Sequence, residues 1–186
     1  MKKITLLLLA TILTFVISSC SKKEDVAPVT IVGKWTLSGF GSITDTKTYD
    51  ATIEEIRKIS TVTTKQADAF AAINFEFKAD KSYLSNYNGN GTYALSQDGK
   101  SIVMTSEKST AAKPIVETLT IETLSQSELK LGLKKLVKAT GETEFKLGFE
   151  DLANYVFGIY GFAAKGGTSA ELEKVRSIQG TLNLKR

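Results

Sequence analysis

Carboxylates are the side chains of this sequence that could perform acid–base chemistry, because its 186 residues include no histidine. Histidine is the usual general base near neutral pH and the commonest transition-metal ligand, so serine triads, Cys-His dyads and His-ligated zinc are excluded. Three pairs of acidic residues could in principle serve as acid and base: Glu142 with Glu144, Glu150 with Asp151, and Glu171 with Glu173. Neighbouring acidic residues are typical of solvated surface, so we expect no enzyme and no catalytic, cofactor or metal site.

Cys20 is the only cysteine, so the chain cannot form an internal disulfide. An export signal precedes it: Lys2 and Lys3 form a charged start, and an apolar run of 14 residues follows over 4–17. This run is shorter than the roughly 20 residues that span a bilayer as a helix. Residues 17–20 (ISSC) resemble the lipobox of bacterial lipoproteins. This motif implies cleavage after residue 19, lipidation of Cys20 and a place in the cell envelope as an outer-membrane lipoprotein, on its periplasmic or its surface side.

The polar segment 20–30 predicts a flexible, lipidated tether, and we expect one folded domain over 31–186. Cleavage removes Lys2 and Lys3 from the 24 basic residues and leaves the 20 acidic ones, so the net charge becomes +2. This balance indicates no nucleic-acid partner. The expected partner is instead the membrane, through the lipid, and the domain is expected to be a monomer. Residues 23–25 (KED) resemble the surface-export signal of Bacteroidota lipoproteins, but an ordinary solvated charge run explains them as well.

Apolar and polar residues alternate along most of the domain, which predicts strands with one buried and one solvated face. Ile73, Phe75 and Phe77 show the pattern clearly. Glycine-rich turns at 88–91 (NGNG) and 98–99 (DG) favour tight hairpins between such strands. Nine strands are expected, at 34–40, 73–78, 83–87, 92–96, 102–105, 115–124, 128–137, 142–147 and 181–185. About eight or nine strands suit a mainly β, antiparallel up-and-down barrel.

Two stretches have the period of a helix instead. Isoleucines three apart in the segment 51–72 predict a helical insertion after the first strand. Apolar residues from Phe149 to Tyr160 predict an amphipathic helix, and a second short helix is expected over 168–176, so that two helices precede the last strand. The helix over 149–160 could be a mobile lid over a ligand or a permanent plug of the core, and the sequence leaves both open.

Three short motifs carry a resemblance to a known family: 33–35 (GKW), 75–83 (FEFKADKSY) and 91–93 (GTY). Together they resemble the lipocalin-like lipoproteins of Bacteroidota, in particular a helix-bearing subgroup. The resemblance implies an eight-stranded barrel with Trp35 at the barrel floor. It also implies that a cationic side chain from the chain's end, Lys185 or Arg186, stacks on this tryptophan.

Two functions from different classes follow from this fold. The first is non-covalent binding of a small apolar or amphiphilic ligand in the barrel, which predicts an internal cavity. The candidate lining residues are Leu37, Phe75, Phe77, Tyr83, Leu131 and Leu133. The alternative is a structural or interaction lipoprotein whose barrel is filled with side chains and whose surface binds a protein or a glycan. It predicts an exposed apolar patch in place of a cavity.

Overall fold

The computed structural model of the chain describes residues 29–110, 112–113 and 115–186, so the export signal and Cys20 lie outside the described residues. One antiparallel sheet contains the ten described strands, which are β1 (Gly33–Thr44), β2 (Thr48–Thr52), β3 (Asn74–Phe77), β4 (Ser82–Ser85), β5 (Gly91–Leu95), β6 (Ser101–Ser106), β7 (Val116–Leu124), β8 (Glu128–Gly132), β9 (Leu136–Val137) and β10 (Ser177–Lys185). The helices are α2 (Ile53–Arg57), α3 (Thr64–Ala71), the 3₁₀ turn η1 (Phe149–Asp151), α4 (Leu152–Ala164) and α5 (Ser169–Lys174). None of the described helices is long and apolar enough to cross a bilayer.

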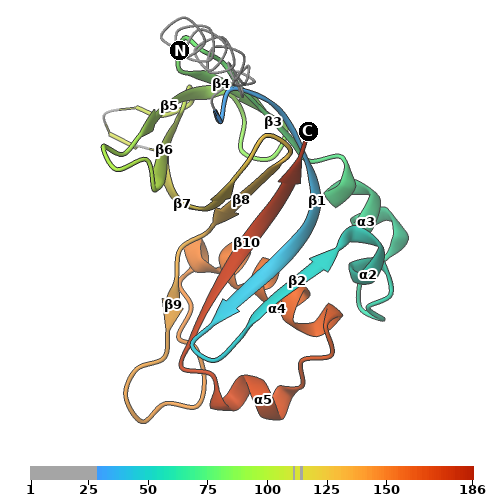
Figure 1. Cartoon of the computed structure of the whole chain (residues 1–186). Coiled ribbons are helices and arrows are strands. Elements are labelled where there is room, and N and C mark those ends of the chain that lie inside the picture. The colour runs from blue at the N-terminus through green and yellow to red at the C-terminus, as the bar shows by residue number, and fades with distance from the viewer. Residues whose placement is uncertain (1–28, 111, 114) are drawn as a thin grey trace, which may run out of the picture.

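Eight of these strands close into a barrel (Figure 1). Strand β1 pairs with β3 on one side, and the order then runs through β4, β5, β6, β7 and β8 to β10. The last strand returns to β1, from Thr36 opposite Lys185 to Thr44 opposite Ile178. Strands β2 and β9 extend the sheet beside β1 and β10. The expected mainly β, antiparallel barrel with short helices is therefore confirmed.

The barrel interior follows the alternation seen in the sequence. Phe75 and Phe77 on β3, and Ile102 and Met104 on β6, are at most 1% exposed. Neighbouring side chains pack against these residues in the interior. For example, the ring centroids of Phe77 and Tyr93 lie 5.1 Å apart. Such burial of apolar side chains is the main stabilising term of a barrel without a disulfide. Along the sequence, the residues of the described core range from Ile31 to Leu184.

The strands differ from the sequence prediction at three places. The strand predicted over 128–137 ends at Gly132 as β8, and Leu136–Val137 form the separate strand β9, which pairs with β10. Residues 48–52 form β2, an unpredicted strand, and the helical insertion α2 and α3 follows it. Residues 142–147 were predicted as a strand but form none. Gly141 has a positive φ of 86° just before them, and this conformation turns the chain away from the sheet. A strand needs a hydrogen-bonded neighbour, and the adjoining strand β9 already ends at Val137.

Trp35 and the last residue of the chain close one end of the barrel. The indole is fully buried, and its Nε1 donates to the carbonyl oxygen of Ile31 at 2.7 Å. The guanidinium carbon of Arg186 lies 4.2 Å from the Trp35 ring centroid, so Arg186 rather than Lys185 is the stacking partner. Its Nη2 also donates to the carbonyl oxygens of Thr30 and Val32, both at 2.7 Å. These contacts join the two ends of the described chain.

Helix α4 crosses the inner face of β1 and β10 (Figure 1), and glycines allow its close approach. A Cβ on Gly161 would lie 2.6 Å from the carbonyl carbon of Gly41, and a Cβ on Gly180 would lie 2.9 Å from the nitrogen of Gly158. Real Cβ atoms do not come so near to backbone atoms. The helix therefore rests almost directly on the backbone of the sheet.

The apolar stripe predicted for this helix is buried only in its second half, where Phe157 is 8% exposed and Tyr160 packs against the core. Phe149 is 94% exposed and Leu152 is 50% exposed. The buried residues of α4 are Phe157, Gly158, Gly161 and Phe162. The reason is that the sequence pattern counts apolar side chains, whereas the contact with the sheet selects the face whose glycines permit close packing. The ring of Phe157 stacks on Phe40 at 4.6 Å, which supports the plug interpretation for this half of the helix.

Candidate ligand site in the barrel mouth

A cavity of about 500 Å³ opens at the end of the barrel opposite Trp35. The Trp35 indole lies against Ile31 and Arg186, beyond the start of β1. Tyr87 and Asn88 of the cavity lie past the other end of the β3–β4 ladder, where the chain leaves β4 after Ser85. We call this space the mouth cavity. It is lined by Tyr83, Tyr87, Asn88, Met104, Ser106, Ile115, Val116, Glu117, Thr118, Lys134, Ala153 and Asn154. Strands β4, β6 and β7 thus form its wall, and the first turn of α4 covers one side.

Aromatic rings and a methionine form the apolar part of the mouth cavity. Tyr83 and Met104 are each 1% exposed and point inward from β4 and β6. Tyr87 continues this surface, and its ring centroid lies 6.0 Å from that of Phe75 and 5.9 Å from that of Phe157. These contacts fix the orientation of the Tyr87 ring from the barrel side and from the α4 side. Contacts with the barrel core and with α4 therefore fix this part of the cavity wall.

Glu117 is the acidic group of this cavity. It lies opposite Met104 in the β6–β7 ladder, so its side chain points inward. Its Oε2 accepts a hydrogen bond from Asn88 Nδ2 at 3.0 Å. Burial raises the pKa of the Glu117 carboxyl above its ordinary value, although the hydrogen bond from Asn88 opposes this shift. The pKa of Tyr87 is also raised, mainly by burial and to a smaller extent by the nearby charge of Glu117.

Lys134 places a positive charge at the edge of the mouth cavity, next to α4. Its Nζ donates to Asp151 Oδ1 at 2.6 Å, and Asp151 also accepts a hydrogen bond from the nitrogen of Gly148. The bond from Lys134, and to a smaller extent that from Gly148, hold the pKa of Asp151 below its ordinary value. This ion pair ties the segment after β8 to the start of α4, and it offsets the lysine charge.

Exposed apolar side chains surround the opening. Ile115 is 44% exposed and Val116 is 52% exposed, and both line the cavity together with Ala153 of α4. Leu152 and the strongly exposed Phe149 precede Ala153 in the chain. We call these five residues the apolar rim. The rim gives an apolar ligand a contact surface outside the cavity as well as inside it.

The six residues predicted to line a ligand site are all buried, at 4% exposure or less. Tyr83 lines the mouth cavity. The other five belong to the packed core: Leu37, Phe75, Phe77, Leu131 and Leu133. The alternating pattern identifies inward-pointing residues, but it does not tell which half of the barrel is filled. Whether a ligand contacts Tyr83 stays a prediction.

Glu117 was missed, although the sequence contains a signal for it. Leu119 and Ile121 alternate with polar residues on the same strand, and Glu117 continues that alternation by two residues. A carboxylate at an inward position is unusual, because a buried charge is costly unless it is paired. Asn88 was read only as part of a turn, and its contact with Glu117 joins residues that are 29 positions apart. Sequence spacing gives no indication of such a contact.

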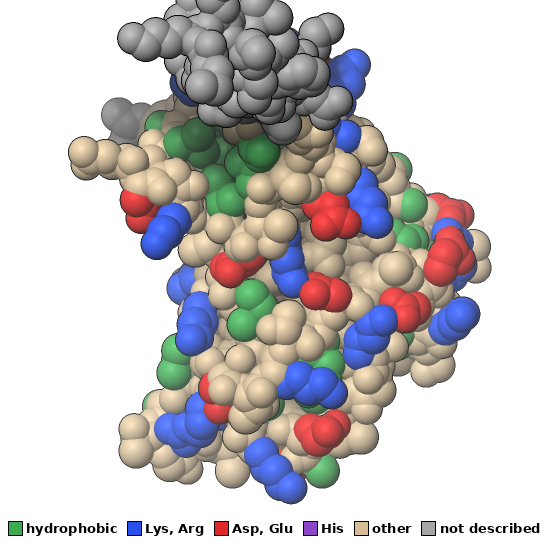
Figure 2. All heavy atoms as spheres, in the orientation of Figure 1, with side chains coloured by type: hydrophobic (Ala, Val, Ile, Leu, Met, Phe, Trp, Pro, Cys, Tyr) green, Lys and Arg blue, Asp and Glu red, His purple; other side chains and the backbone are tan. Residues whose placement is uncertain are grey.

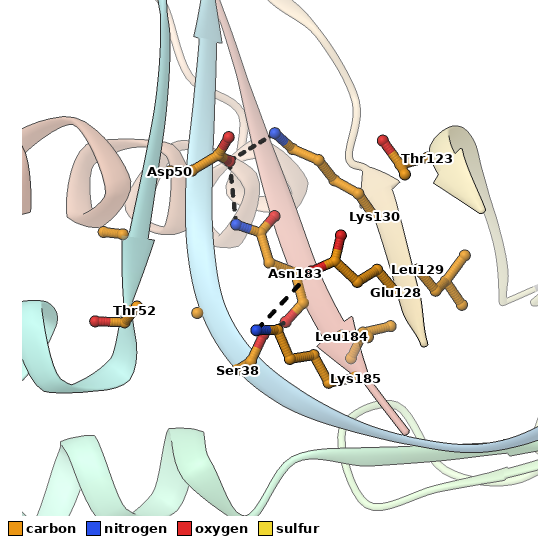
Figure 3. Close-up of a pocket in the computed structure, with 12 residues that line it drawn as sticks. Ser38, Asp50, Thr52, Thr123, Glu128, Leu129, Lys130, Asn183, Leu184 and Lys185 are labelled. Atoms are coloured by element: carbon orange, nitrogen blue, oxygen red, sulfur yellow. Dashed lines mark hydrogen bonds and ion pairs between the residues drawn. The ribbon is translucent and has the colours of Figure 1, made fainter. Parts of the chain in front are cut away.

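A second depression, of about 300 Å³, lies on the outside of the barrel over β2, β8 and β10 (Figure 3). Lys130 Nζ and Asn183 Nδ2 both donate to Asp50 Oδ1, at 2.6 and 3.1 Å. Lys185 Nζ lies 3.9 Å from Glu128 Oε1. Basic and acidic side chains are interspersed over this face of the molecule (Figure 2). We call this depression the outer groove; its charges are paired with one another, and its lining contains no aromatic ring.

Among the residues that the structure describes, no group of three or more Asp, Glu, Cys or His side chains could hold a metal ion. Glu117 is the one carboxylate among the described residues that line the mouth cavity. The mouth cavity therefore has one acidic group in a largely apolar wall.

A closed, eight-stranded antiparallel barrel with a cavity at its mouth is the architecture of proteins that hold one small ligand. The chain belongs to the lipocalin-like domain family, whose model matches residues 31–131. The match begins just before β1 and ends within β8, so α4 and the closing strand β10 lie beyond it. No significant match was found among curated proteins or among solved structures.

Proposed function

We propose that this protein binds a small apolar or amphiphilic molecule non-covalently in the mouth cavity and performs no chemistry on it. The observation that carries this proposal is the cavity itself, about 500 Å³ between a packed aromatic wall and the first turn of α4. Ligand pockets of proteins are typically 300–1,000 Å³, mostly apolar, with a few polar groups that orient the ligand. The mouth cavity combines Tyr83, Tyr87 and Met104 with Asn88 and Glu117, and so fits this description.

The sequence supports a second part of the proposal, that the protein is a lipid-anchored monomer of the cell envelope. Cleavage before Cys20 would leave the lipidated cysteine about ten residues from the barrel, since β1 begins at Gly33. We expect the chain to be labelled by radioactive palmitate in a bacterial host, and Cys20→Ser to abolish the labelling because the acyl chains are attached to this residue. Labelling that persists in Cys20→Ser would contradict the anchor.

A second candidate function is binding of a protein through the apolar rim. Phe149, 94% exposed, favours it, because an aromatic ring so exposed gains free energy when a partner covers it. This function does not need the cavity. Ligand binding that depends on free space in the mouth cavity therefore distinguishes the two.

Ala153→Trp tests the proposed cavity. Ala153 is exposed and lines the opening, so an indole there fills the entrance without disturbing the core. We expect it to weaken binding of the neutral fluorescent probe N-phenyl-1-naphthylamine by about tenfold or more, because the probe loses both space and apolar contact. The measurement is a fluorescence titration of a protein that begins at Ser21, which contains the whole described core.

Ala170→Trp is the matched control, since Ala170 is also exposed but lies on α5, away from the cavity. It is expected to leave the dissociation constant of the probe within about twofold of the unaltered protein. Equal binding by all three proteins would place the probe outside the mouth cavity. That result would favour a surface site, such as the apolar rim, over the proposed function.

A further inference from the structure

Glu117 and Asn88 form a hydrogen-bonded pair in the wall of the mouth cavity. Asn88 Nδ2 donates to Glu117 Oε2, which is the only orientation of the amide that suits an ionised carboxylate. Asn88 Oδ1 then points away from Glu117 and is buried. The acceptor that this pair offers to a ligand is therefore the Glu117 carboxylate, whose second oxygen the Asn88 bond leaves available.

The charge of the cavity points in the same direction. No described Lys or Arg side chain forms an ion pair with Glu117, and the cationic group in the lining, Lys134, is bonded to Asp151. An anionic ligand would bring a second negative charge beside Glu117 in a poorly solvated space. A cation in the same place would gain a charge-assisted hydrogen bond to the carboxylate.

The aromatic residues complete the arrangement. Tyr83 and Tyr87 line the cavity together with Glu117 and Asn88, and the faces of tyrosine rings attract cations. A primary ammonium has three N–H donors, one of which would suit the Glu117 carboxylate. The rest of the lining and the apolar rim provide contacts for a hydrocarbon chain.

We infer, on the basis of the proposed function, that the mouth cavity selects amphiphiles with an ammonium group, which donates to Glu117 while the apolar chain lies along Tyr83, Tyr87 and Met104. Amphiphiles that carry a carboxylate in the same position are bound more weakly. Glu117 is the residue that determines this specificity, and Asn88 positions it.

The test compares three ligands of equal chain length, decylamine, decanol and decanoic acid, each below the concentration at which it forms micelles or exceeds its solubility. Isothermal titration calorimetry is made at pH 8 and not at a lower pH, because burial raises the pKa of Glu117 and a higher pH favours its ionised form. We expect decylamine to bind about tenfold or more tightly than decanoate, with decanol between them. Glu117→Gln keeps the shape but removes the charge, and it should bring decylamine and decanoate to within about threefold of each other.

Glu122→Gln is the control, because Glu122 is an exposed carboxylate on the same strand and should change neither affinity. Decanol binding to Glu117→Gln shows that the cavity of this variant is intact. Decanoate binding as tight as decylamine, or a preference for decylamine that survives Glu117→Gln, would overturn this inference and leave the cavity as a ligand site. Failure of all three ligands to bind the unaltered protein would instead overturn the proposed function.

Discussion

Trp35→Ala is expected to lower the free energy of unfolding by about 4 kcal/mol, because truncation of a large, fully buried aromatic side chain leaves a cavity that the core cannot close. The substitution also removes the hydrogen bond from Nε1 to Ile31 and the surface on which Arg186 stacks. The measurement is urea denaturation followed by circular dichroism, since Trp35 is the only tryptophan of the chain. A loss below about 1 kcal/mol would contradict its place at the closed end of the barrel.

Arg186→Ala is the natural companion to this experiment. It retains the indole but removes the guanidinium that covers it and that donates to Thr30 and Val32. Arg186 is exposed, so we expect a smaller loss, of about 1 kcal/mol. The fluorescence of Trp35 reports directly on this change, because it is the only indole and it lies beneath the guanidinium.

Gly161→Ala is expected to lower the free energy of unfolding by about 2 kcal/mol, although alanine is the better helix former by roughly 1 kcal/mol. The new Cβ would lie 2.6 Å from the carbonyl carbon of Gly41, and neither backbone can yield without moving α4 off the sheet. Urea denaturation monitored by Trp35 fluorescence measures the effect. A stabilised Gly161→Ala would show that α4 does not rest on β1.

Gly158→Ala is the matched control for Gly161→Ala, three residues earlier in the same helix. Its Cβ would lie 3.2 Å from the end of the Ile178 side chain, which has more freedom to move than a backbone. The cost of crowding is then partly offset by the gain in helix propensity. We expect a net change below about 1 kcal/mol, clearly smaller than that of Gly161→Ala.

The barrel was predictable because its strands carry strong local patterns. Phe75 and Phe77 alternate with polar neighbours, and the loops 88–91 and 98–99 contain residues that adopt positive φ. Gly89 and Gly99 have φ of 85° and 68° in the structure, as such turns require. The N-cap of the last helix was predictable for the same reason, since Thr168 and Glu171 form a capping box.

Features that depend on distant parts of the chain were not predictable. Strand β2 exists because β1 continues past its pairing with β3 and offers a free edge to residues 48–52. The buried face of α4 also includes Gly158 and Gly161, which lie close to Gly180 and Gly41 on two other strands, so the helix sequence alone identifies only part of this face. Residues 142–147 show the converse, because an alternating pattern forms no strand where no neighbour is available.

The candidate site illustrates the same limit. Sequence alternation correctly places Tyr83 in the interior, but it gives equal weight to Phe75, Phe77 and Leu131, which fill the core. The mouth cavity exists because α4 rests on β1 and β10 and leaves β4, β6 and β7 uncovered at this end. Its polar pair, Asn88 and Glu117, forms only when the hairpin loop meets β7.

The most direct test of the account is to locate a bound ligand by NMR. Decanol, which is neutral, is titrated into the isotopically labelled protein beginning at Ser21, and the backbone amide shifts are followed. We predict that the largest changes occur around the mouth cavity, at Tyr87, Ser106, Thr118 and Asn154. Changes centred on Asp50, Lys130 and Asn183 in the outer groove, or no saturable change at all, would contradict the claim that this barrel holds its ligand in the mouth.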